Sequence, residues 1–153
     1  MPFLSSMNIS ASALTAERFR MDVIAENMAN IQNTRTANGG PYRRRYVIFQ
    51  ERERAQDFSC IFNRTGHTHR ALKRRIPGGG VRVVGVGEDT APFKLEYNPT
   101  HPDADAEGYV QLPNVEVVQE MTDIMAAYRV YEANITALNT FKDMAMKTLE
   151  IGR

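Results

Sequence analysis

The stretch from Val115 to Ile151 constrains the fold of this chain more than any other feature, because its 37 residues include neither glycine nor proline. It predicts a single helix, roughly 55 Å long at about 1.5 Å per residue. Apolar side chains fill nine of ten successive heptad positions, and Lys142 is the exception. The apolar positions are Val117, Met121, Ile124, Tyr128, Tyr131, Ile135, Leu138, Ala145 and Leu149. Such a long helix requires partners along its apolar face.

A second helical pattern covers about residues 4–31. Its apolar positions Met21, Ile24, Met28 and Ile31 recur at steps of three and four residues. Met7 and Leu14 extend the series backwards at heptad spacing. Ser10 and Glu17 interrupt the series, so its first half is the weaker one. Asparagine, glycine and proline then accumulate towards Pro41, and we expect the helix to end before them.

Between the two helical patterns the period changes to short β-branched and aromatic runs bounded by turn residues. Strands are predicted at 46–49, 81–86, 93–97 and 109–112. The stretch 55–76 is polar and basic without a clear period, and it predicts a loop. The expected fold class is therefore α+β, with three parts: an N-terminal helix in 1–36, a β-rich insert in 37–112 and a C-terminal helix in 113–153.

The two helices are expected to pair with each other as a coiled-coil-like body. No third element of the sequence is long enough to cover them. A two-helix body of this length leaves apolar surface in contact with water, so neighbouring copies are expected to cover the remainder. This reasoning predicts a structural subunit of a helical assembly.

The net charge of +1 conceals a strong asymmetry along the chain. Residues 35–94 carry a charge of +8, whereas residues 95–153 carry −6. Opposite charges of this kind can guide copies into contact, and we assign possible lateral contacts to Arg43, Arg44, Arg45, Lys73, Arg74 and Arg75. A nucleic-acid-binding middle region fits the charges almost as well, but no recognition motif accompanies it. Contact with the acidic part of the same protein is the simpler interpretation.

Candidate chemistry is sparse. Cys60, His67 and His69 lack the spacing and the fourth ligand of a zinc site, and the acidic run at 103–107 lacks the final carboxylate of a calcium loop. No nucleophile motif is present. We therefore expect no enzymatic activity, no metal and no cofactor. We also expect no membrane insertion, because no run approaches about 18 apolar residues, and no cleaved signal peptide.

Several motifs follow one another in fixed order, in the segments 9–16, 20–24, 27–30, 33–36, 40–44, 79–81, 97–99, 101–105, 108–110, 113–115, 120–123, 126–127, 131–134 and 149–153. This order resembles that of the flagellar rod and hook protein family. The family motif after the first helical stripe is carried by Asn27, Ala29, Asn30, Asn33 and Thr34. The resemblance covers 3–54 and 77–153, whereas 55–76 has no counterpart.

The resemblance implies a structural subunit of the proximal rod, the drive shaft that crosses the periplasm and transmits motor torque. It implies export by the flagellar type III apparatus without a cleaved signal peptide. The implied partners are further copies of the chain, other proximal and distal rod proteins and the ring-to-rod adaptor. It implies neither catalysis nor binding of nucleic acid.

Overall fold

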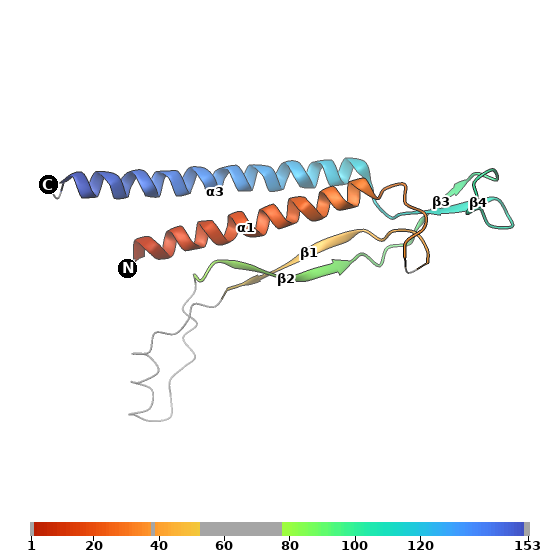
Figure 1. Ribbon diagram of the computed structural model, residues 1–153, viewed down its shortest axis with the longest axis horizontal. Coiled ribbons are helices and arrows are strands. Elements are labelled where there is room, and N and C mark those ends of the chain that lie inside the picture. Colours follow the sequence, from red (N-terminus) through yellow and green to blue (C-terminus); the bar gives the residue numbers. More distant parts are fainter. Residues whose placement is uncertain (1, 38, 53–77, 152–153) are drawn as a thin grey trace, which may run out of the picture.

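Two long helices lie side by side and give the molecule an elongated shape (Figure 1). A computed structural model of the chain describes residues 2–37, 39–52 and 78–151. Helix α1 spans Pro2–Ala29 and helix α3 spans Val117–Ile151. The predicted pairing of the two terminal helices is confirmed.

Both helices begin or end close to the residues predicted from their turn signals. At the end of α1, the backbone N–H of Asn30 still donates to Glu26 O at 3.1 Å, and a turn follows in which Asn33 N–H donates to Asn30 O at 3.0 Å. At the start of α3, Glu120 N–H donates to Glu116 O at 3.0 Å, just after the buried Val115. The predicted limits were therefore correct to within two residues.

The insert contains two antiparallel strand pairs. Strand β1 (Arg45–Glu51) pairs with β2 (Val81–Glu88), with a register shift between Ile48 and Phe49. Strand β3 (Lys94–Tyr97) pairs with β4 (Tyr109–Leu112). All four predicted strands are confirmed, and with them the α+β fold class. The predicted loop at 55–76 lies outside the described residues.

Helix α1 forms the middle layer of the molecule (Figure 1). It contacts α3 on one side and the β1–β2 pair on the other. The buried apolar side chains of the helix pair accordingly lie mostly on α1, at Ala16, Val23 and Ile24, with Ala127 opposite on α3. Among the described helices and strands, only α1 contacts α3. One side of α3 therefore has no cover within the described chain.

The β1–β2 pair is attached to α1 by a close backbone approach. Val81 N–H donates to Ser12 Oγ at 3.1 Å, and the Ser12 hydroxyl donates to Ile9 O at 2.7 Å. Gly80 precedes Val81 with a φ of +93°, and a Cβ added there would lie 2.2 Å from Ser12 Oγ. Only glycine fits this position, because it combines a positive φ with contact against a helix.

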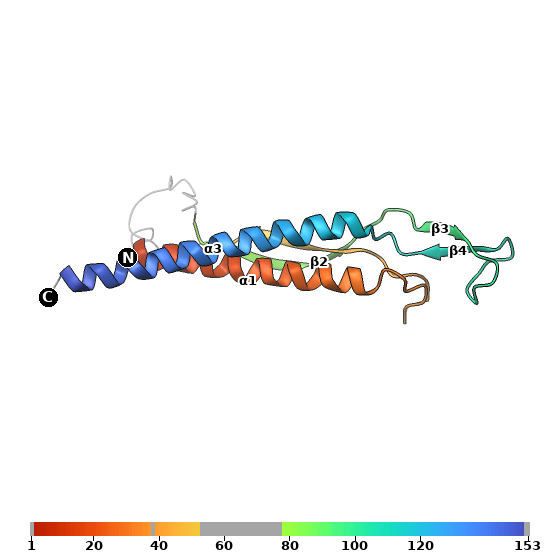
Figure 2. The ribbon, with the colours of Figure 1, turned by 90° about the horizontal axis from the view of Figure 1, so that it is seen from above.

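The β3–β4 hairpin continues the long axis beyond the helix pair, at the end opposite to both termini (Figure 2). Tyr97 and Tyr109 face each other across this hairpin in an edge-on contact, with their ring centroids 5.3 Å apart. The two ends of the molecule therefore differ in structure: one is a strand hairpin and the other is a pair of helix ends.

Candidate assembly surface

A buried polar cluster joins α1, α3 and the segment that enters β1. Its centre is Glu120 on α3, whose side chain is completely buried. Glu120 Oε1 accepts a hydrogen bond from Arg44 Nε at 2.6 Å, and its Oε2 accepts one from Asn27 Nδ2 at 3.0 Å. A buried carboxylate is tolerated only when it is paired and hydrogen-bonded, as it is here.

Asn27 uses its side-chain amide fully within this cluster. Its Oδ1 accepts hydrogen bonds from Tyr42 OH at 3.0 Å and from Arg45 N–H at 2.9 Å. Its Nδ2 donates to Arg45 O at 2.8 Å, in addition to Glu120. Asn27 therefore connects the helix pair to the first residue of β1.

The remaining contacts extend the polar cluster at its edge. Arg44 NH2 lies 3.1 Å from Asp123 Oδ2, and the Arg44 backbone N–H donates to Asn114 Oδ1 at 2.8 Å. Asn114 Nδ2 in turn donates to Asp89 O at 3.3 Å. These contacts hold together parts of the chain that lie far apart in sequence.

Burial of Tyr42 affects its ionisation. Burial raises the pKa of the Tyr42 phenol above its ordinary value of 10.0, and the negative charge of Glu26 adds to the rise, while Arg45 opposes it. The neutral phenol is therefore the form that donates to Asn27.

The family motif occupies the end of α1 and the turn after it. Asn27 is completely buried, whereas Ala29 is exposed in the last turn of the helix. Asn30 Nδ2 donates to Glu26 O at 2.9 Å, and Asn33 Nδ2 donates to Asn30 Oδ1 at 3.2 Å. Thr34 Oγ1 donates to Asp103 Oδ2 at 2.9 Å, which links the turn to the loop between β3 and β4. The motif thus contributes to the fold of the single chain.

The predicted residues of α1 lie largely on its covered sides. Ile24 is buried, and the other five are partly buried: Met7, Leu14, Met21, Met28 and Ile31. Ser10, which interrupts the apolar series, is also buried. Glu17, the second interruption, has an Oε2 atom that is buried without a hydrogen-bond donor among the described residues. The weaker first half of the series therefore does carry polar groups into the interior.

The predicted residues of α3 divide into two groups. Ile124, Tyr131, Leu138 and Ala145 are partly buried, and α1 is the one described helix or strand that contacts α3. The other five remain substantially exposed: Val117, Met121, Tyr128, Ile135 and Leu149. The apolar stripe of α3 is therefore wider than the part that α1 covers.

Helix α3 therefore has two seams, an inner one and an outer one. The inner seam faces α1 and consists of Glu120, Ile124, Ala127, Tyr131, Asn134 and Leu138, all buried or partly buried. The outer seam is exposed and consists of Val118, Met121, Met125, Tyr128 and Ile135. Its members follow heptad spacing, with Glu132 as the one interruption. The exposed fractions of Val118, Met125 and Tyr128 are 71%, 55% and 57%.

Sequence reasoning missed five of these positions: Val118 and Met125 in the outer seam, and Glu120, Ala127 and Asn134 in the inner seam. Val118 and Met125 lie one heptad apart on the outer side of the predicted stripe, and their own spacing could have indicated a second stripe. Glu120 and Ala127 could not have been identified by hydrophobic periodicity, because one is charged and the other is small. Their burial depends on what approaches α3 from elsewhere in the chain.

Three of the basic residues assigned to lateral contacts are engaged within the chain. Arg44 belongs to the buried polar cluster, so we do not retain it as a lateral contact. The Arg43 guanidinium lies 4.4 Å from the centre of the Phe93 ring. Arg45 NH1 lies 3.0 Å from Glu26 Oε1, and both side chains are partly exposed. The other three, Lys73, Arg74 and Arg75, lie outside the described residues.

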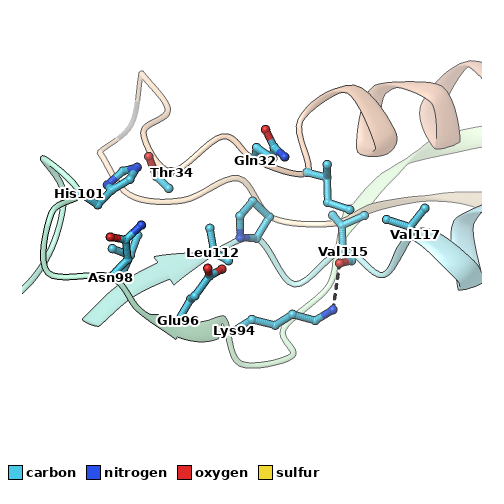
Figure 3. Close-up of a pocket in the computed structure, with 12 residues that line it drawn as sticks. Gln32, Thr34, Lys94, Glu96, Asn98, His101, Leu112, Val115 and Val117 are labelled. Atoms are coloured by element: carbon cyan, nitrogen blue, oxygen red, sulfur yellow. Dashed lines mark hydrogen bonds between the residues drawn. The ribbon is translucent and has the colours of Figure 1, made fainter. Parts of the chain in front are cut away.

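A groove of about 520 Å³ adjoins the start of α3 (Figure 3). Its apolar lining includes Leu112, Val115 and Val117, and Gln32 and Glu96 come from opposite sides of it. Across the groove floor, Lys94 Nζ, also part of the lining, donates to Val115 O at 3.2 Å. Because Val117 is itself exposed, the uncovered apolar surface of α3 continues into the groove.

The described residues offer no group of histidine, cysteine, aspartate or glutamate side chains that could hold a metal ion. The candidates Cys60, His67 and His69 lie outside the described part of the chain. Neither described helix has an apolar stretch long enough to cross a bilayer. The surface features of the described residues are thus those of an elongated subunit with an uncovered apolar seam.

Comparison with known proteins identifies the family. Residues 106–151 match the family described as flagellar basal body rod FlgEFG protein C-terminal. The chain is 48% identical to flagellar basal-body rod protein FlgC of Bacillus subtilis (strain 168) over 152 residues, which cover 97% of each chain. It is 43% identical to FlgC of Borreliella burgdorferi over 155 positions, 99% of this chain and 98% of the relative. It is 41% identical to FlgC of Escherichia coli O157:H7 over the whole of both chains. The chain therefore belongs to the FlgC family of flagellar basal-body rod proteins.

Proposed function

We propose that this chain is a structural subunit of the proximal rod and that it joins neighbouring subunits through the outer seam of α3. The observation that carries the proposal is the exposure of a heptad series of large apolar side chains on a helix whose inner seam is already paired with α1. Burial of one such side chain contributes about 1.5–3 kcal/mol. The five side chains, which extend from Val118 to Ile135 with Glu132 as the one interruption, therefore favour association along this part of the helix.

The neighbours are further copies of the chain and other rod proteins, with the ring-to-rod adaptor at the membrane side. The subunit reaches the periplasm through the flagellar type III export apparatus and there forms part of the drive shaft. Long helices packed along a common axis resist bending, which suits the transmission of torque. The family membership and the elongated helix pair support this assignment.

The charge asymmetry of the chain supports contacts beside the helical packing. Arg43 is exposed, and α3 carries exposed acidic residues such as Glu132, Asp143 and Glu150. Lateral charge contacts between subunits would therefore affect how they are oriented, more than how strongly they bind.

The experiment introduces a charge into the outer seam. Tyr128→Asp and Ile135→Asp are each expressed as the only copy of the gene, and isolated basal bodies are viewed by electron microscopy. We expect rings without a rod and loss of swimming, because a buried aspartate without a partner opposes association. Thr140→Asp is the matched control, since Thr140 is exposed on the same helix and outside the seam.

Complete rods in the cells that carry Thr140→Asp would show that a new charge on α3 is tolerated in itself. Complete rods and normal swimming with both Tyr128→Asp and Ile135→Asp would contradict the proposal.

A further inference from the structure

The face of α3 that α1 covers is not its most apolar face. The heptad series from Val117 to Leu138 contains only apolar residues. The inner seam that α1 covers shares some of these residues but also includes Glu120, Ala127 and Asn134. The two series differ by a turn of roughly 50° about the helix axis, half of the step between neighbouring residues. Hydrophobic burial alone would therefore favour a different orientation of α3.

We propose that the buried polar cluster determines which face of α3 packs against α1 and thereby keeps the outer seam free for a neighbouring subunit. Asn27 and Glu120 are the positioning residues, and the second copy or other rod subunit that covers the outer seam is that of the proposed function, on which this inference rests. A single buried asparagine fixes register and partner choice in coiled coils in the same way.

The geometry of Glu120 explains why only one orientation is acceptable. Its carboxylate lies at 2.6 Å from Arg44 Nε and at 3.0 Å from Asn27 Nδ2, and it is completely buried. Turning α3 so that the more apolar series faced α1 would move the carboxylate away from both donors. The turn would also leave one N–H of the buried Asn27 amide and the Arg44 guanidinium without their acceptor, so it is unfavourable.

Asn27 and Arg44 are themselves held by the segment before β1. Tyr42 OH and both backbone groups of Arg45 fix the Asn27 amide, and Asn114 accepts from the Arg44 backbone N–H. The donors that meet Glu120 therefore have defined positions. A rigid set of donors can discriminate between two orientations of a helix, whereas a mobile surface side chain could follow the helix as it turns.

The test measures the exposure of two adjacent positions on α3. Ala127 is fully buried in the inner seam and Tyr128 is exposed in the outer seam. Single cysteines are placed at these positions in the Cys60→Ser background, and their labelling rates with a maleimide are compared. The purified subunit is kept in trimethylamine N-oxide, an osmolyte that strengthens burial. In the parent we expect the cysteine at 128 to react roughly tenfold faster or more.

The decisive variant is Glu120→Met, which conserves volume and removes the carboxylate. We expect the two labelling rates to converge, because hydrophobic burial then favours the more apolar series, which covers position 128 and exposes position 127 more, and we expect fewer complete rods in cells. Glu120→Gln keeps a side-chain carbonyl that can accept from Arg44 or Asn27, so the parental ratio of rates should return. Val110→Ala, in β4 and outside the helix pair, controls for general destabilisation and should leave the ratio unchanged.

An unchanged ratio in Glu120→Met would overturn this inference, as would equally fast labelling of both positions in the parent. Neither result would contradict the proposed function. The Tyr128→Asp variant tests the outer seam in cells independently of the groups that orient α3. Conversely, complete rods with both Tyr128→Asp and Ile135→Asp would contradict the proposed function even if the labelling ratio depended on Glu120.

Discussion

At the scale of single residues, the stability of the fold depends on pairing a buried carboxylate. Glu120 is completely buried, whereas its partner Arg44 retains about a quarter of its exposure. Such a pair contributes little relative to apolar residues of the same size, but loss of one partner leaves the other charge buried without compensation. Removal of Arg44 alone is therefore expected to destabilise the fold more than replacement of both members by apolar residues.

We expect Arg44→Ala to lower the free energy of unfolding by about 3 kcal/mol, because Glu120 then retains only Asn27 as a donor. Unfolding in urea at neutral pH measures the change. Arg43→Ala is the matched control, since Arg43 is exposed and its guanidinium contacts only Phe93 and Asp89 O among the described groups. Equal losses in the two variants would contradict a special role for the Arg44–Glu120 pair.

Tyr42 gives the fold a dependence on alkaline pH. Its pKa is raised in the folded chain, chiefly by burial, so the unfolded phenol ionises first as the pH rises. The stabilisation is complete below the unfolded pKa of 10.0 and is lost as the pH rises through the folded pKa. We expect Tyr42→Phe to reduce this alkaline loss, at a cost of about 1 kcal/mol at pH 7 for the hydrogen bond to Asn27. Denaturant unfolding across pH 7 to 11 would show it, and an unchanged pH profile would contradict it.

At the scale of the elements, the contact between the β1–β2 pair and α1 depends on Gly80. We expect Gly80→Ala to destabilise the chain by about 2 kcal/mol or more, because alanine meets both a positive φ and the Ser12 hydroxyl. Thermal unfolding measures the loss. Gly85→Ala in the same strand is the control, since an added Cβ there has no neighbour within 4 Å among the described atoms. Similar losses for both substitutions would show that the close approach at Ser12 is unimportant.

The elements themselves could be predicted from sequence because each has a local signal. The period of 3.6 residues and the absence of glycine and proline predicted α3, and the cluster of turn residues after Asn30 predicted the end of α1. Short β-branched and aromatic runs bounded by turn residues predicted the four strands. The orientation of α3 had no local signal, because it depends on Asn27, Tyr42 and Arg44, which lie 76 or more residues before Glu120. Asn27 was identified only by resemblance to a family.

At the scale of the whole molecule, three layers leave one helix face uncovered. Helix α1 is enclosed between α3 and the β1–β2 pair, and the exposed apolar side chains of α3 continue into the groove beside it (Figures 1 and 3). The two ends of the molecule are also different, with the β3–β4 hairpin at one end and both termini at the other. A contact between two unlike surfaces relates neighbouring subunits by a rotation. When repetition of that rotation does not close a ring, the subunits form a helical assembly.

The central claim is that neighbouring subunits cover the outer seam in the assembled rod. The most direct measurement is thiol labelling of Met125→Cys, in the Cys60→Ser background, in the free subunit and in purified basal bodies. Labelling after denaturation of the basal bodies gives the total amount of cysteine at position 125. We expect rapid reaction in the free subunit, where Met125 is 55% exposed, and strong protection in the basal bodies. Equally rapid labelling in both would show that the outer seam remains in water in the rod, and would contradict the account.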